Sequence, residues 1–151
     1  RWAEGWKATS EGRRRLRKVA FDFPQELLDT PCLRMAVTPG GDELVVRSGS
    51  TVRILGRDMS SSGTTFELSN YHGEIAASEE FIYTTQADRD ICCFTHDGTE
   101  VAKYEDPDKL ANFPVLGPGG LLFSVLYEDG EDEQDEIVAL DARTLQPRHR
   151  F

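Results

Sequence analysis

The chain has 151 residues, an apolar content of 38% and a formal net charge of −10 at pH 7. This length suffices for one domain with a core. The negative charge excludes general attraction to nucleic acid, because such binding needs clustered Lys and Arg. No stretch approaches the ~20 apolar residues of a membrane span, and the start lacks the pattern of a secretory signal.

The three cysteines, Cys32, Cys92 and Cys93, suggest neither a disulfide framework nor a zinc site, since no CxxC spacing occurs. We therefore expect an intracellular protein in a reducing compartment, with no cofactor. The chain starts at Arg1 and stops at Phe151, directly after a predicted strand. We expect it to be an excerpt of a longer polypeptide.

Residues 1–31 differ from the rest of the chain. They carry a net charge of about +2, whereas the remainder carries −12. Trp2 and Trp6 lie four residues apart, a spacing that favours the start of a short helix. The nearby glycines, Gly5 and Gly12, disfavour that helix. A basic run then precedes an alternating apolar segment around Phe21 and Phe23, which indicates a strand.

From Cys32 onward, short apolar segments and turn signals alternate regularly. The first unit has strands near 33–37, 44–46, 52–55 and 65–68, with turns at Pro39-Gly40-Gly41 and Ser48-Gly49-Ser50. The second repeats the order at 74–78, 81–85, 91–94 and 100–104, with an Asp97-Gly98 turn. The third has strands at 115–116, 121–127, 137–140 and 144–151. The second strands start about 37 and 40 residues apart, a spacing typical of propeller repeats.

The hairpin ICCFTHDGTEV, within residues 91–101, resembles the third and fourth strands of NHL-type repeats. The segment EIVALDARTL, residues 136–145, is similar to the equivalent piece of quinoprotein-like and WD40-like repeats. The Trp-Asp and Gly-His signatures of true WD40 repeats are absent. The resemblance implies an all-β fold of four-stranded antiparallel β-propeller blades. We assign residues 32–70, 71–112 and 113–151 to one blade each, and residues 1–31 to an extension or to the end of a preceding blade.

Continuous apolar strands such as LVV, FIY and IVAL predict blades that are buried on both faces, which requires neighbours on both sides. Closed propellers use about 4 to 8 blades. Three blades form an incomplete ring. We therefore expect further blades of the same polypeptide, or a protein partner, to cover the open faces.

Two charged segments and two aromatic residues are candidate partner contacts. The acidic loop at residues 128–136 predicts either a solvated hairpin, a surface for a basic partner, or a calcium site. The basic run at residues 13–18 predicts a solvated edge, a contact with phosphate, or pairing with the acidic propeller or an acidic neighbour. The tryptophans, together with Phe21 and Phe23, form either an aromatic anchor for a partner or part of the core of a preceding unit. The candidate contacts are Trp2, Trp6, Arg13, Arg14, Arg15, Asp129, Glu131, Asp132, Glu133 and Asp135.

The other chemically distinctive residues favour structural roles. Cys92 and Cys93 are adjacent, so a strand points them to opposite faces, and they cannot share a metal. His72, His96 and His149 show no catalytic or metal-binding spacing. The glycine clusters lack the features of a phosphate-binding loop.

We expect a non-catalytic propeller segment that acts as a protein interaction scaffold or complex subunit. One alternative is part of a calcium-assisted propeller enzyme of the lactonase or hydrolase kind, for which Asp42, Asp90, Asp97 and Asp141 are the acids to test. Another is a calcium-responsive acidic loop.

Overall fold

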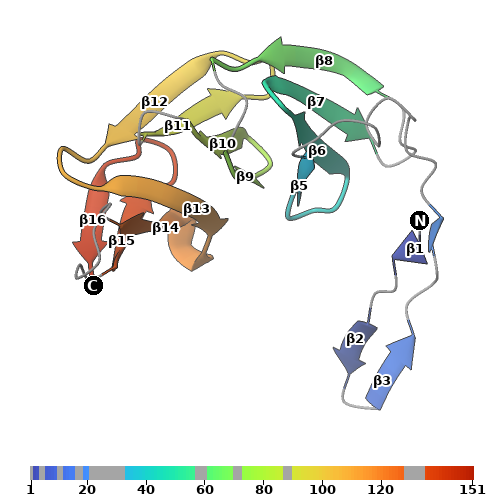
Figure 1. The fold of residues 1–151 in the computed structure, drawn as a ribbon. Helices are drawn as coiled ribbons and strands as arrows, with labels where there is room; N and C mark the ends of the chain where they lie inside the picture. The colour runs from blue at the N-terminus through green and yellow to red at the C-terminus, as the bar shows by residue number, and fades with distance from the viewer. Residues whose placement is uncertain are drawn as a thin grey trace.

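The computed structural model describes residues 33–56, 61–69, 73–86, 90–127 and 135–151, with backbone alone at 61–63 and in four short strands near the N-terminus. Three four-stranded antiparallel sheets follow one another in an arc (Figure 1). This arrangement confirms the predicted all-β fold of four-stranded repeats. Sheet I comprises β5 (Leu33–Val37), β6 (Glu43–Ser48), β7 (Thr51–Gly56) and β8 (Ser61–Glu67).

Sheet II comprises β9 (Ile75–Ala77), β10 (Phe81–Thr85), β11 (Asp90–Thr95) and β12 (Glu100–Glu105). Sheet III comprises β13 (Leu110–Leu116), β14 (Leu121–Tyr127), β15 (Glu136–Asp141) and β16 (Pro147–Arg150). In each sheet the strands pair in chain order. The first strands lie toward the inside of the arc, where β9 contacts both β5 and β13, while β8 and β12 follow its outer edge (Figure 1).

The N-terminal strands form two pairs. β1 (Trp2–Ala3) pairs with β4 (Val19–Ala20), and β2 (Trp6–Thr9) pairs with β3 (Gly12–Arg15). The alternative that the two tryptophans begin a helix is therefore wrong. The backbone here is extended, in keeping with the low helix propensity of the nearby glycines.

The turns explain the short connections within the sheets. Gly49 has φ +63° in the two-residue turn between β6 and β7, a conformation that glycine adopts without steric cost. In the β11–β12 turn, Gly98 has φ +87° and its N–H donates to the Thr95 carbonyl at 2.9 Å. Between β13 and β14, Pro118–Gly120 forms a short 3-10 turn, η1.

β13 begins at Leu110, ahead of the predicted blade boundary at residue 113. Its apolar pattern is interrupted by a bulge, where the pairing with β14 shifts between Asn112 and Val115. Phe113 occupies this bulge with φ +54° and is 55% exposed. Because the bulge breaks the apolar pattern, the sequence predicted only the last residues of this strand.

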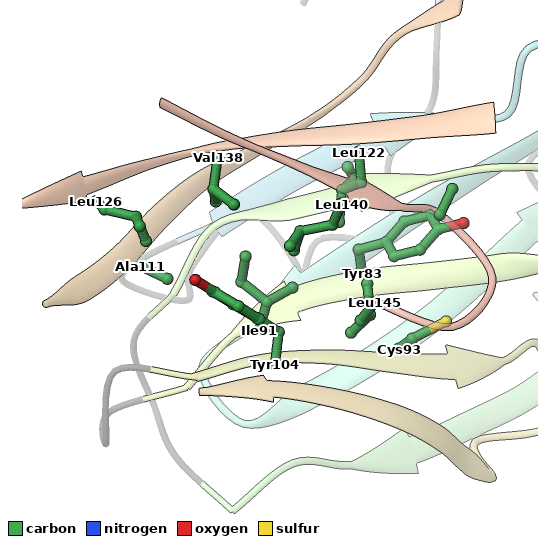
Figure 2. Packing of buried hydrophobic residues seen from close by; sticks show 12 residues of the cluster. Tyr83, Ile91, Cys93, Tyr104, Ala111, Leu122, Leu126, Val138, Leu140 and Leu145 are labelled. Carbon is green, nitrogen blue, oxygen red and sulfur yellow. The ribbon is translucent and has the colours of Figure 1, made fainter. Parts of the chain in front are cut away.

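Apolar side chains fill both spaces between the sheets. The cluster between sheets I and II contains Val45, Ile54, Ile82, Cys92 and Phe94 among its members. The cluster between sheets II and III includes Tyr83, Ile91, Leu122, Val138, Leu140 and Leu145 (Figure 2). Burying each large aliphatic side chain contributes about 1.5–3 kcal/mol, so stacking of the sheets is a main source of stability.

One charged side chain also joins two sheets. Arg47 of β6 is 1% exposed, and its guanidinium reaches sheet II. It donates to the Gly49 carbonyl at 3.1 Å, to the Thr85 carbonyl at 3.0 Å and to the Thr84 hydroxyl. Buried charge requires such hydrogen bonds, so this arginine fixes sheet I against sheet II at a defined position.

Candidate functional site

Most of the predicted partner contacts lie outside the described residues. This holds for the side chains of Trp2, Trp6, Arg13, Arg14 and Arg15 and for Asp129, Glu131, Asp132 and Glu133. Asp135 is described and is exposed just before β15. The predicted roles of these residues, including calcium binding by the acidic loop, stay predictions.

The four aspartates of the enzyme alternative do not converge. Asp90 and Asp97 lie at opposite ends of β11. Asp90 is 3% exposed and is paired with Lys103, whereas Asp97 accepts the Thr99 N–H at 3.1 Å within its own turn. Within the described ranges, no group of three or more His, Cys, Asp or Glu residues could hold a metal ion.

The adjacent cysteines point to opposite faces of sheet II, as predicted. Cys92 packs in the cluster with sheet I, and Cys93 packs in the cluster with sheet III. Burial raises the pKa of each thiol to about 12, so both are protonated at neutral pH. Both are free cysteines that fill space in the core.

The two described histidines also lie apart. The His96 ring contacts two neighbouring segments, with Nδ1 3.0 Å from Glu43 Oε2 and Nε2 3.2 Å from the Ser78 carbonyl. It therefore connects sheet I to the β9–β10 turn. His149 lies on the exposed β16, with its ring 6.1 Å from that of Phe151.

Turns from all three sheets meet around a pocket of about 540 Å³. The β5–β6 turn belongs to sheet I, the β9–β10 turn to sheet II, and η1 and the β15–β16 turn to sheet III. Because antiparallel strands alternate in direction, these turns lie at the same end of the strands in all three sheets. We call this the turn end of the arc. The lining residues are Pro39, Ser78, Glu79, Glu80, Phe81, Tyr83, Leu116, Gly119, Gly120, Asp141, Ala142 and Arg143.

Polar contacts join the walls of this pocket. Glu79 accepts the N–H of Gly40, which links sheet II to sheet I. Glu80 Oε2 lies 2.7 Å from Arg143 Nη2, which links sheet II to sheet III. The Ala142 N–H donates to the Gly120 carbonyl at 2.8 Å, so η1 and the β15–β16 turn are held together.

Asp141 has a fixed position on the sheet III side. Its carboxylate is hydrogen-bonded by the Arg148 side chain at 2.8 Å and by the N–H groups of Thr144 and Arg143 at 3.0 and 3.1 Å. These hydrogen bonds hold the pKa of Asp141 well below its ordinary value. The carboxylate is therefore ionised at neutral pH.

The outward side of sheet III is a second candidate surface. In sheets I and II, one row of side chains across the strands packs against the next sheet: Ala36, Val45 and Ile54 in sheet I, and Ala76, Tyr83, Cys93 and Ala102 in sheet II. The corresponding row of sheet III is Val115, Phe123, Ala139 and His149. We call this row, with Val125, Ile137 and Phe151 beside it, the outer face of sheet III.

The outer face of sheet III is apolar and partly open. Val115 is 59% exposed, Ile137 46% and Phe151 72%, while Phe123 and Val125 are half-buried. The equivalent Tyr83 of sheet II is 1% exposed, because sheet III covers it. Sheet III thus carries the stacking surface of a blade, without a blade stacked on it among the described residues.

The site residues that the sequence did not indicate are Glu79, Glu80 and Arg143. Each lies in a turn, where charged residues are ordinary and carry no motif. The sole local signal is a pair of adjacent acids in the β9–β10 turn. Glu80, in this pair, contacts Arg143 more than 60 residues later in the chain, and that contact depends on stacking of sheet III on sheet II.

The sheets define a class of protein: among the described residues they are about three consecutive blades of a β-propeller, which do not close into a ring. No protein-family model matches the sequence, and no curated protein matches it. Solved structures do match. BamB from Moraxella catarrhalis is 16% identical with a TM-score of 0.62, covering 78% of this chain and 35% of BamB.

A protein of unknown function from Bacteroides caccae is 13% identical with a TM-score of 0.59. That match covers 95% of this chain and 52% of the other. The chain therefore spans about a third of one of these structures and half of the other. At such identities the likeness defines the fold alone. No helix in the described part of the chain has the length and apolar character needed to cross a membrane.

Proposed function

We propose that this chain is a β-propeller segment that serves protein–protein interaction, as a scaffold or a subunit of a larger assembly. The observation that carries the proposal is the outer face of sheet III. Its partner is a further four-stranded blade, contributed by the same polypeptide or by another protein. Such a blade presents alternating Leu, Ile or Val side chains, as sheet III itself presents Leu122, Val138 and Leu140 to sheet II.

Continuity with the existing interfaces supports this choice of partner. Sheet I stacks on sheet II, and sheet II stacks on sheet III, through the same row of side chains. These contacts are head-to-tail, since each sheet offers one face to its predecessor and the opposite face to its successor. A head-to-tail series continues until the ring closes, so the next unit in the series is another blade.

The test is the association state of the 151-residue chain as a function of concentration, measured by sedimentation velocity. The open apolar surface predicts self-association. Ile137→Lys places a charge on the outer face of sheet III and is expected to weaken the association at least about tenfold, because burying an unpaired charge is costly.

Val101→Lys is the matched control. Val101 is 47% exposed, close to the 46% of Ile137, but it lies on β12, the outermost strand of sheet II. This variant is expected to associate like the original chain. A chain that stays monomeric at all concentrations, or an equal effect of the two substitutions, would contradict the proposal.

A further inference from the structure

The pocket at the turn end of the arc already holds one guanidinium. Arg143 Nη2 lies 2.7 Å from Glu80 Oε2, and Arg143 Cζ lies 5.9 Å from the centre of the Phe81 ring. A carboxylate beside an aromatic face is a combination that favours a planar cation. The side chains of Arg143 and Glu80 are 71% and 62% exposed, so water competes with this pair and a partner's side chain can replace Arg143.

The charge of the pocket is not balanced by Arg143. Three carboxylates line it, from Glu79, Glu80 and Asp141. Arg143 pairs with Glu80, and Arg148, outside the lining, pairs with Asp141 at 2.8 Å. Within the described part of the chain, the carboxylate of Glu79 has no cationic partner. Glu79 is fixed by the Gly40 N–H, and Asp141 is fixed by its turn. The Glu79 wall therefore presents negative charge in a defined position, and attraction of a further cation requires no rearrangement of this carboxylate.

One wall allows close approach of a polypeptide backbone. Gly119 and Gly120 have φ +71° and +72°, and a methyl group added to either would meet no atom within 4 Å. The surface at these two glycines is thus open. Glycine at such positions permits a neighbouring main chain to come close.

We propose that this pocket receives an arginine side chain from an extended basic segment of a partner protein. The guanidinium contacts the Glu79 carboxylate and displaces Arg143 from Glu80 and the Phe81 ring, while the backbone of the segment passes over Gly119 and Gly120. Arginine fits better than lysine, because its planar group both stacks on an aromatic ring and pairs with a carboxylate. This inference rests on the proposed interaction function and adds the chemistry of one partner.

The test is a fluorescence anisotropy titration with a labelled Gly-Ser-Arg-Ser-Gly peptide at low ionic strength. The same peptide with citrulline is the matched ligand, since citrulline keeps the shape of arginine without its charge. The arginine peptide is expected to bind at least about fivefold tighter. Unlabelled N-acetyl-arginine amide is added as a competitor. It competes poorly if the protein recognises the extended segment, and it competes fully if the protein recognises the arginine side chain alone.

Two substitutions have opposite expected effects. Glu79→Gln is expected to weaken binding of the arginine peptide about threefold, through loss of one carboxylate. Arg143→Ala is expected to strengthen it about threefold or more, because it releases Glu80 and Phe81 for the ligand. A purely structural role of Arg143 would not give tighter binding. Glu105→Gln, an exposed carboxylate at the other end of sheet II, is the control and is expected to have no effect.

Equal binding of the arginine and citrulline peptides would overturn the inference, as would weaker binding by Arg143→Ala or full competition by N-acetyl-arginine amide. The titrations are run on the original chain and on Ile137→Lys. The proposed function is tested separately, by sedimentation without peptide and by substitution on the outer face of sheet III. The two proposals can therefore fail independently of each other.

Discussion

Gly98→Ala tests whether the contact between sheets I and II is as close as the structure has it. Gly98 lies in the β11–β12 turn with φ +87°, and a Cβ there would lie 2.6 Å from both Cβ and Cγ of Phe66 on β8. Phe66 in turn packs on Phe94 of sheet II, with 5.6 Å between ring centres. The methyl group must therefore displace an aromatic ring that belongs to the interface between the sheets.

The expected cost has two parts. The left-handed backbone costs an alanine about 1 kcal/mol, and overpacking adds about 1–3 kcal/mol, for a total of about 2–4 kcal/mol. Gly41→Ala separates the two parts, because Gly41 has φ +74° but no atom within 4 Å of an added Cβ. Its cost is the backbone part alone, about 1 kcal/mol.

The assay is urea unfolding followed by far-ultraviolet circular dichroism on the 151-residue chain and both variants. With a slope of about 1–3 kcal/mol per molar urea, the two variants should differ by about 1 M in midpoint. Equal midpoints for Gly98→Ala and Gly41→Ala would refute the close contact of the β11–β12 turn with Phe66.

Two further predictions concern ionisable groups. Burial opposes ionisation of Asp106, but hydrogen bonds from the Asp108 N–H, the Tyr104 hydroxyl and the Arg150 guanidinium outweigh it and lower its pKa. Its contribution to stability is therefore present above about pH 4 and lost as the pH falls through the lower, folded-state pKa. Asp106→Asn should cost about 1–3 kcal/mol at pH 7 in urea unfolding and lose less stability on acidification, and parallel pH profiles for the two proteins would contradict this reasoning. Cys92 and Cys93, whose pKa burial raises to about 12, should react with iodoacetamide at pH 8 at least about 100-fold more slowly in the native chain than in urea, as resolved by peptide mass spectrometry. Rapid native labelling of either thiol would show that the core around it opens.

The fold could be predicted from the sequence because its determinants are local. Turn residues such as Gly49 and Gly98 lie where two apolar segments must reverse direction, and their positive φ values are those that the turns require. The spacing of the segments then implied repeats, and the continuous apolar strands implied sheets covered on both sides. The adjacent Cys92 and Cys93 illustrate this well, since each fills a different interface.

The pocket and the Arg47 contact could not be predicted, because both depend on how one sheet lies on the next. An arginine within an apolar strand gives no sign of whether it reaches solvent or, like Arg47, carbonyl groups of another sheet. The charged turn residues carry no motif of their own. Their meeting depends on the twist and offset between stacked sheets, and a single sequence contains no periodic signal for these quantities.

The two proposed interactions act on the same stack of sheets. Glu79 contacts sheet I and its neighbour Glu80 contacts sheet III, so the pocket has its observed shape only while all three sheets are stacked. A ligand that binds this shape stabilises the stack by mass action, by about 2.7 kcal/mol at a hundred times its dissociation constant. That is comparable to the burial of one large apolar side chain. A basic segment in the pocket would thus reinforce the arc from its turn end, while a further blade on the outer face of sheet III would extend it, and each would favour the conformation that the other requires.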